Sequence, residues 1–372
     1  MGKKARISIL YNEPANGADA GRQYISETGA LRRAGGALSR GKEHAGAPRE
    51  AVDLSEVGVL EEMEDIKAAL DSLGYRTSIL NVDSDIYRLI DYLREDRPDL
   101  VFNLVECVEN DSLQEMNVAG LYELLKIPYT GAGPLALGTA LNKPRMKELL
   151  TSNGVQTPRY YVIRPTSRIT VPEETVFPLI VKPEHEDGSV GISDSSVVFT
   201  AGELRKRVRY VFEEFEQAAL VEQYIEGREL NVAILGHRNP VILPVSEIDF
   251  SGMTAEMNKI VSYEAKWMQG SAAYEGTKGV CPAKLSAQQE RVLKETALRC
   301  CQLVGCRDYA RVDFRMTDEG EIYLLEVNPN PDISDDAGFA RSARAAGLTF
   351  QEIVSTIVES ALERAATDRQ DA

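Results

Sequence analysis

Apolar and polar positions in the first third of the chain alternate between strand-like and helix-like patterns. Short apolar runs bounded by turn residues predict strands, and apolar residues spaced three or four apart predict helices. The strands are expected at residues 7–10, 77–82 and 100–105, and the helices at 54–73 and 84–95. This order is typical of a parallel sheet with crossover helices.

The rest of the chain predicts further strands interleaved with amphipathic helices. The helices are expected at residues 113–125, 142–153, 201–215, 287–305 and 349–365. The strands are expected at residues 160–163, 177–182, 219–224, 229–235, 241–248, 309–316 and 322–326. We therefore expect three packed units, with boundaries near residues 140 and 228.

Two segments show no regular period. Residues 15–50 are rich in glycine, alanine and arginine, which predicts a mobile functional loop or a disordered insert. The last residues, 367–372, are mostly polar, and we expect a disordered tail there. The predicted units are then residues 1–140, 141–228 and 229–366.

The composition is acidic, with 42 lysines and arginines against 58 aspartates and glutamates and a net charge of −16. Nucleic acid and anionic membranes are poor candidate partners, because both require clustered cations. No apolar run approaches the roughly 18 residues of a membrane span, and the apolar run after the basic start is too short for a signal peptide. Five cysteines, an odd number, do not resemble a disulfide framework. We expect a soluble, cytoplasmic protein.

Two predicted strands near the C-terminus carry polar residues at alternate positions. Arg311 and Asp313 are two residues apart, so their side chains project from the same face of a sheet. Glu326 and Asn328 have the same spacing on the second strand. If the strands are neighbours, three oxygen donors meet, and such a set suits Mg²⁺. A solvated sheet face with an aspartate–arginine ion pair remains the alternative.

A second group of residues suits a nucleotide. Lys143 opens a predicted helix, and Lys182 ends a strand before the glycine-containing loop 187–191, whose N–H groups can cover phosphates. Residues 221–229 form a strand that leaves through a short hinge, where backbone groups can meet an adenine and Glu229 can bind a ribose. Each feature is weak evidence alone, but together they predict Mg-ATP as the ligand.

In their order along the chain, these features resemble the ATP-grasp superfamily and, within it, the D-alanine–D-alanine ligases. The motifs that carry the resemblance are Pro128-Tyr129-Thr130-Gly131, Lys143, residues 177–182, Ser189-Val190-Gly191, residues 222–229, Tyr263-Glu264-Ala265-Lys266, Cys281-Pro282-Ala283, residues 311–313, residues 326–328 and Ala346-Gly347-Leu348. The resemblance implies an α/β chain with a Rossmann-like parallel-sheet domain at its N-terminus. A two-subdomain ATP-grasp fold of α+β type would follow, with a lid at 141–228 and a catalytic subdomain at 229–366.

The same resemblance implies roles for individual residues. The ATP-binding set would be Lys143, Lys182, Ser189, Val190, Gly191, Glu222, Tyr224, Ile225, Glu229, Lys266 and Leu325. The ligands of two Mg²⁺ ions, or of Mn²⁺ as an alternative, would be Asp313, Glu326 and Asn328. The catalytic set would be Arg311, Lys266 and Ser189. The reaction implied is attack of a carboxylate on ATP to give an acyl phosphate, followed by attack of an amine.

The chain departs from the family pattern where the amino acids would bind. The family's Leu-His-Gly is Leu104-Val105-Glu106 here, its serine–leucine pair is Ala337-Gly338, and a glycine of the same loop is Asp332. Candidate substrate residues are therefore Glu13, Glu106, Asp332, Ala337, Gly338 and Arg341. The acids among them suggest a cationic or amine-rich acceptor, with solvated helix-capping carboxylates as the alternative.

Three functions stay open from the sequence. The leading hypothesis is an ATP- and Mg-dependent ligase that joins amino acids other than, or in addition to, D-alanine. The second is D-alanine–D-alanine ligase itself, and the third is an ATP-binding regulatory protein without turnover. The expected partners are small-molecule amino acids, and the resemblance is compatible with a homodimer that the composition does not require.

Overall fold

The computed structural model describes residues 4–12, 23–25, 31–33, 54–82, 84–109, 111–334 and 337–370 of the 372-residue chain. The candidate substrate residue Glu13 lies outside these residues, as does most of the predicted insert at 15–50. Within that insert a two-stranded antiparallel hairpin is described, formed by β2 (Gln23–Ile25) and β3 (Leu31–Arg33).

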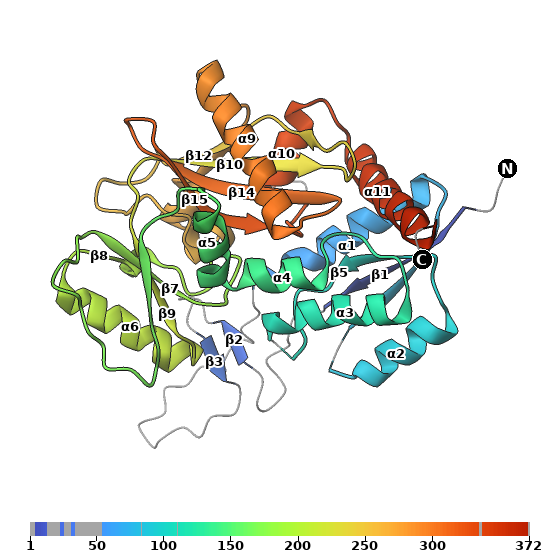
Figure 1. Ribbon diagram of the computed structural model, residues 1–372, viewed down its shortest axis with the longest axis horizontal. Coiled ribbons are helices and arrows are strands. Elements are labelled where there is room, and N and C mark those ends of the chain that lie inside the picture. The colour runs from blue at the N-terminus through green and yellow to red at the C-terminus, as the bar shows by residue number, and fades with distance from the viewer. Residues whose placement is uncertain are drawn as a thin grey trace.

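The N-terminal unit is a parallel sheet covered on both faces by helices (Figure 1). Its strands are β1 (Arg6–Tyr11), β4 (Arg76–Asn81) and β5 (Leu100–Leu104), in the order β4-β1-β5. Apolar residues of α1 (Leu54–Ser72) and α11 (Phe350–Gln370) pack on one face, and those of α2 (Ile86–Glu95) and α3 (Glu115–Leu125) on the other. The predicted parallel sheet with crossover helices is confirmed.

The middle unit is a small antiparallel sheet with one helix packed against it, at the lower left of Figure 1. Its strands, in the order β6-β9-β7-β8, are β6 (Tyr160–Ile163), β7 (Leu179–Pro183), β8 (Val197–Val198) and β9 (Ala219–Gln223). Helix α6 (Ala201–Phe215) lies across the sheet, with Leu204, Val208 and Val211 packed against Val181 and Val221.

The C-terminal unit is built on a larger antiparallel sheet. Its strands are β10 (Arg228–Leu235), β11 (Val241–Ile242), β12 (Ser246–Asp249), β13 (Lys278–Val280), β14 (Tyr309–Met316) and β15 (Ile322–Asn328). Helix α9 (Ala287–Val304) packs on this sheet with apolar residues that belong to the same core as the N-terminal helices.

The other helices are α4 (Pro134–Leu141), α5 (Lys143–Ser152), α7 (Tyr263–Trp267), α8 (Ala272–Glu275) and α10 (Gly338–Ala345). A 3₁₀ turn at Ser112–Gln114 precedes α3, and another at Asp194–Ser196 precedes β8.

Three details differ from the sequence-based expectations. The strand expected at 241–248 is two short strands, because Pro244 lies between them and cannot donate a ladder hydrogen bond. Helix α11 continues to Gln370, so the described part of the predicted disordered tail is helical. The short helices α4, α7, α8 and α10 were not predicted, since each is too short for a periodic pattern.

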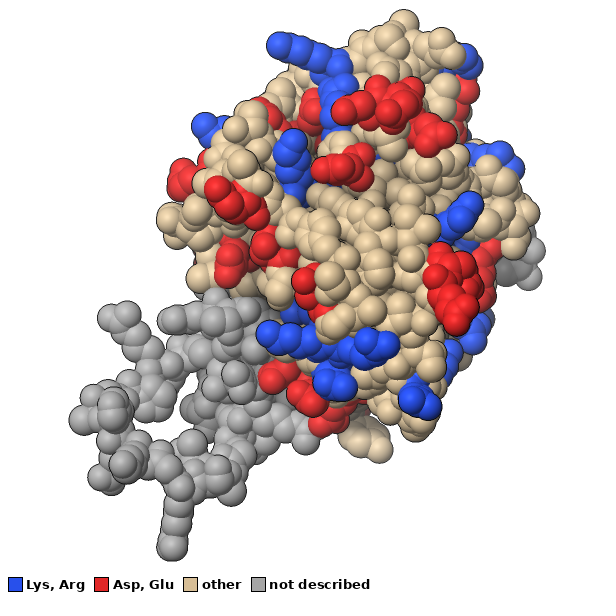
Figure 2. All heavy atoms as spheres, turned by 90° about the vertical axis from the view of Figure 1, so that its left-hand side faces the viewer, with Lys and Arg blue, Asp and Glu red and all other residues tan. Residues whose placement is uncertain are grey.

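The charge is not gathered into one patch on the face that Figure 2 presents. Acidic and basic side chains lie there in small mixed groups, although the whole chain carries a net charge of −16. In the part of the chain that the structure describes, no helix has the length and apolar character needed to cross a membrane.

Candidate active site

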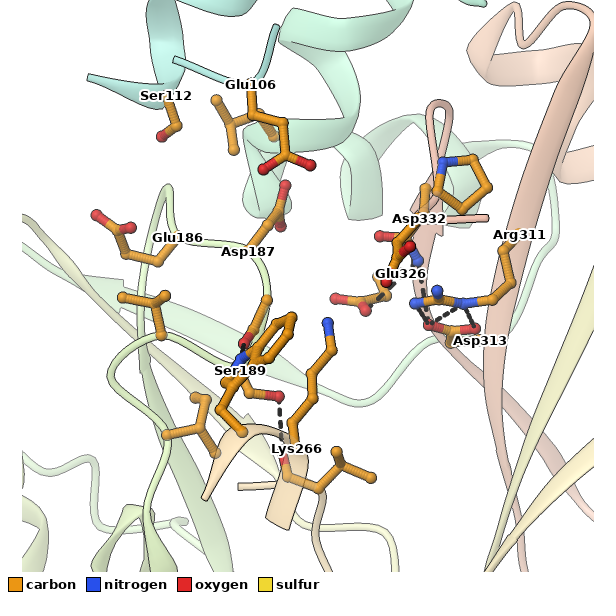
Figure 3. A pocket seen from close by; sticks show the side chains of 18 of the residues that line it. Glu106, Ser112, Glu186, Asp187, Ser189, Lys266, Arg311, Asp313, Glu326 and Asp332 are labelled. Carbon is orange, nitrogen blue, oxygen red and sulfur yellow. Dashed lines mark hydrogen bonds and ion pairs between the residues drawn. The ribbon is translucent and has the colours of Figure 1, made fainter. Parts of the chain in front are cut away.

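A single large cavity of about 1950 Å³ collects residues from all three units. Every described residue of the predicted site lines it except Gly191, which lies just behind the wall against Pro183 and Phe215. Figure 3 shows Glu106 and Asp187 directed into the same space as Lys266, with Arg311 and Asp313 in contact at its far side. The structure therefore brings together residues that are more than two hundred positions apart in the sequence.

The floor of the cavity is the pair of neighbouring strands β14 and β15. Their antiparallel register places Asp313 opposite Glu326 and Arg311 opposite Asn328. The amide nitrogen of Asn328 donates to Asp313 at 3.1 Å and to Glu326 at 3.5 Å. The structure therefore brings the side chains of Asp313, Glu326 and Asn328 together, as the sequence predicts.

Asp313 is the most strongly held of these side chains. Arg311 donates to its carboxylate through Nε at 2.9 Å and Nη2 at 2.8 Å, and Asn231 on β10 donates at 2.7 Å. Burial alone would raise the pKa of Asp313, but the charge and hydrogen bonds of Arg311 outweigh it and lower that pKa. The carboxylate therefore stays ionised, as a ligand of a hard cation must.

Behind the floor lies a trio of charges in which Glu222 and Lys147 are buried and Lys182 is partly exposed to the cavity. Glu222 on β9 is 1% exposed, and its two oxygens contact Lys147 at 2.6 Å and Lys182 at 2.8 Å. Burial alone would raise the pKa of Glu222, but the charges and hydrogen bonds of the two lysines outweigh burial and lower the pKa to about 2. The side chain of Glu222 thus fixes Lys182, and any contact with a base in the hinge falls to the backbone of this strand.

Two further lysines reach the cavity from other elements. Lys143 is the first residue of α5, and the side chain of the N-cap residue Asn142 accepts a hydrogen bond from the backbone N–H of Arg145. The ammonium group of Lys143 contacts Asp187 at 3.0 Å and the carbonyl of Glu186. Lys266 on α7 stacks on the ring of Trp267, 4.5 Å from its centroid. Burial, followed by the charge of Arg311, lowers the pKa of Lys266.

The glycine-containing loop is fastened to the segment around α7. Ser189 has a positive φ of 64°, and its hydroxyl donates to the carbonyl of Val261 at 2.8 Å. The indole nitrogen of Trp267 donates to the carbonyl of Gly188 at 2.9 Å. These bonds make Ser189 an anchor of the loop in this structure, while its part in catalysis stays a prediction.

The opposite side of the cavity suits an aromatic base and a ribose. Ile225 and Leu325 supply apolar surface, and the hydroxyl of Tyr224 donates to the carbonyl of Lys259 at 3.2 Å. Glu229 contacts Arg315 at 2.8 Å. Burial raises the pKa of Glu229 against the opposing effect of Arg315, so its carboxyl group is poised to exchange hydrogen bonds with hydroxyl groups.

The candidate amino-acid residues lie around the remaining wall. Ala337 and Gly338 begin α10, whose N-cap has no side-chain hydrogen bond. One turn later, Arg341 donates to the hydroxyl of Ser246 at 3.2 Å and lies over Gly279, where a side chain would collide with its guanidinium group. Glu106 and Asp332 also line the cavity.

Sequence reasoning missed several polar and charged residues of this site. Lys147 follows Lys143 by one helical turn, so its position was readable from spacing. Asn231 follows Glu229 by two residues on one strand, but its contact with Asp313 depends on which strands pair. Arg315 continues the alternation of Arg311 and Asp313 on its strand, whereas Glu62 and Glu115 had no local signal.

Comparison with known proteins places these features in context. A family model described as the D-ala D-ala ligase C-terminus matches residues 149–359. A D-alanine–D-alanine ligase of Stutzerimonas stutzeri is 33% identical over 299 residues, which cover 80% of this chain and 88% of that protein. A protein of Sinorhizobium fredii described as uncharacterized is 30% identical over 306 residues, covering 81% and 87%. The fold is shared with the crystal structure of D-alanine–D-alanine ligase from Bacillus anthracis complexed with ATP, at a TM-score of 0.69, 21% identity and coverage of 98% and 99%.

Proposed function

The chain belongs to the D-alanine–D-alanine ligase family of ATP-grasp ligases, and from this premise we propose that it uses ATP to join two amino acids through an amide bond. The observation that carries the proposal is the convergence of lysines, Arg311 and two carboxylates in one cavity. Phosphoryl transfer needs positioning and charge neutralisation more than a protein nucleophile, and this set supplies both.

In the proposed reaction a carboxylate oxygen of one amino acid attacks the γ-phosphorus of ATP, and ADP departs. The amine of the second amino acid then attacks the acyl carbon of the resulting acyl phosphate, loses a proton and displaces phosphate. We assign Lys143 and Lys182 to the α- and β-phosphates, Lys266 to the γ-phosphate, and Arg311 to the charge that develops on the transferring group and the later oxyanion. The cavity must also exclude water, because an acyl phosphate hydrolyses readily.

The floor of the cavity suits divalent metal ions. Asp313 and Glu326 offer carboxylate oxygens at one place, and the Asn328 amide, whose nitrogen donates to both, would offer its oxygen after rotation of the amide; this is the chemistry that Mg²⁺ prefers. We propose that they hold two Mg²⁺ ions, with Mn²⁺ as a substitute. Bound there, the ions neutralise charge on the phosphates, while Arg311 keeps Asp313 ionised.

D-alanine is the second candidate substrate. The relatives named D-alanine–D-alanine ligase favour it over our expectation that other amino acids are joined. The changed residues Glu106, Asp332, Ala337 and Gly338 favour a different pair.

Phosphate release from ATP across pairs of D- and L-amino acids, with mass spectrometry of the products, tests the proposal. We expect ADP, phosphate and one amide product in equal amounts for at least one pair. D-alanyl-D-alanine as the sole product would select the second candidate. Absence of phosphate release with every pair would remove both and leave a nucleotide-binding protein without turnover.

A further inference from the structure

A small niche opens beside the amino-acid end of the cavity. It has a volume of about 10 Å³, close to that of one water-sized group. Four carboxylates line it, and each also lines the main cavity. They are Glu62 on α1, Glu106 after β5, Glu115 on α3 and Asp332 in the loop before α10.

Three of the four carboxylates of the niche, Glu62, Glu115 and Asp332, accept hydrogen bonds from neutral donors. Glu62 is 6% exposed and accepts one hydrogen bond, from the backbone N–H of Ile333 at 3.0 Å. Glu115 accepts from the amide of Asn330 at 3.2 Å. Among the described residues, no lysine or arginine forms an ion pair with Glu62, Glu115 or Asp332.

A tyrosine hydroxyl gives independent evidence that the niche receives a ligand. Tyr309 is 3% exposed and lines the niche. Within the described part of the chain its hydroxyl has no hydrogen-bond partner. Because Tyr309 is a lining residue of the niche, its hydroxyl oxygen is free to accept a hydrogen bond from a ligand bound there.

The electrostatics of the niche agree with a positively charged ligand. Burial, and then the charge of Asp332, raises the pKa of Glu62 well above its ordinary value. Burial and the charge of Glu106 do the same for Glu115. A positive charge in the niche would favour the ionised carboxylates and relieve this repulsion.

We propose that the niche binds the ammonium group of a basic side chain, so that one of the two amino acids joined by this ligase carries a second amino group. This inference rests on the proposed ligase function. An ammonium group is water-sized and donates three hydrogen bonds, which matches the volume and the acceptors of the niche.

The experiment compares two basic amino acids with neutral ones. Lysine and ornithine are assayed against norleucine, Nε-acetyl-lysine and alanine, as both enantiomers, in pairs, by ATP-dependent phosphate release with the full chain. We expect kcat/KM for pairs containing lysine or ornithine to exceed that of the neutral pairs at least about tenfold, because a charged hydrogen bond is lost in the neutral pairs.

Two variants connect that selectivity to the niche. Glu62→Gln keeps the shape and an acceptor for Ile333, and Glu115→Gln is its counterpart on the other wall. Each should raise the KM for the diamino acid at least about tenfold and leave the KM for ATP unchanged. Glu64→Gln is the matched control, because Glu64 is exposed on the same helix.

Equal use of norleucine and lysine, or an unchanged KM in Glu62→Gln and Glu115→Gln, would overturn the inference. If no pair releases phosphate, the proposed function fails, and the niche is tested by binding. Lysine, but not norleucine or potassium chloride, should then raise the thermal midpoint of the wild-type chain and not that of Glu62→Gln. Absence of that shift, or an equal shift with potassium chloride, would overturn the inference on its own.

Discussion

The two ends of the cavity treat buried charge in opposite ways. At the proposed phosphoryl end, Glu222 contacts Lys147 and Lys182, and Asp313 contacts Arg311, so both of these acids have a cation beside them. At the amino-acid end, Glu62 and Glu115 are held by neutral groups only, among the described residues. The pKa of Glu222 is lowered to about 2, whereas that of Glu62 is raised.

We infer from this difference that the acids of the first end are neutralised within the protein, whereas those of the second end are neutralised by a substrate. Ion pairs fix Lys182 and Arg311 in the structure, and in the proposed reaction this would be the preorganisation that phosphoryl transfer uses. Carboxylates without cations destabilise the chain until a positive ligand binds. Substitutions at the two ends should therefore change stability in opposite directions.

Breaking the buried trio should have the largest effect on stability. Glu222→Gln leaves Lys147 and Lys182 without their counter-charge, so we expect the free energy of unfolding to fall by about 3–5 kcal/mol. Urea denaturation measures the loss, with exposed Glu226→Gln as the control. A loss no larger than that of the control would show that the trio is not held as described.

Removing a proposed metal ligand should have the largest effect on turnover. Glu326→Ala should lower kcat by about 10²–10³ through lost charge neutralisation, with little change in thermal midpoint. Steady-state phosphate release checks this, and Glu321→Ala, at an exposed position just before β15, is the control. Near-normal turnover in Glu326→Ala would reject the metal assignment.

The trio also predicts a dependence of stability on pH. The pKa of Glu222 lies at about 2 in the folded chain, below its ordinary value of 4.5. A lowered carboxyl pKa contributes stability above the unfolded value, and this contribution is lost as the pH falls from about 4.5 to about 2. Unfolding free energies measured across that window should fall less steeply for Glu222→Gln than for the wild type; parallel curves would contradict the assignment.

The amino-acid end should respond with the opposite sign. A raised carboxyl pKa contributes stability below its unfolded value, and this contribution is lost as the pH rises. At neutral pH and without substrate, Glu62→Gln should therefore stabilise the chain by about 0.5–2 kcal/mol. Chemical denaturation against Glu64→Gln measures this, and a clear destabilisation would indicate that Glu62 already has a cationic partner.

The smallest effect is expected beside Arg341. A methyl group at Gly279 would lie 1.9 Å from the guanidinium carbon, so Gly279→Ala must displace Arg341 from the wall. We expect the KM for one amino acid to rise about threefold, with the KM for ATP unchanged. Gly120→Ala, which meets no atom within 4 Å, is the control. An unchanged KM for both amino acids would exclude Arg341 from binding them.

The clustering of side chains on β14 and β15 could be predicted from the sequence, and the carboxylates of the niche could not. Alternation along two strands identified Asp313 and Glu326, because strand periodicity is local. Glu62 sits in an ordinary acidic helix, and its role depends on a contact with Ile333, 271 residues away. Tyr309 reads as a core residue of its strand, since nothing local shows that its hydroxyl meets a cavity.

Transfer of oxygen from substrate to phosphate tests the central claim most directly. The amino acid whose carboxylate is activated is labelled with ¹⁸O in both carboxylate oxygens, and the released phosphate is analysed by mass spectrometry. The account predicts one ¹⁸O atom in each phosphate, because the attacking oxygen leaves with the phosphoryl group when the amine displaces it. Unlabelled phosphate formed together with the amide product would contradict an acyl-phosphate ligase.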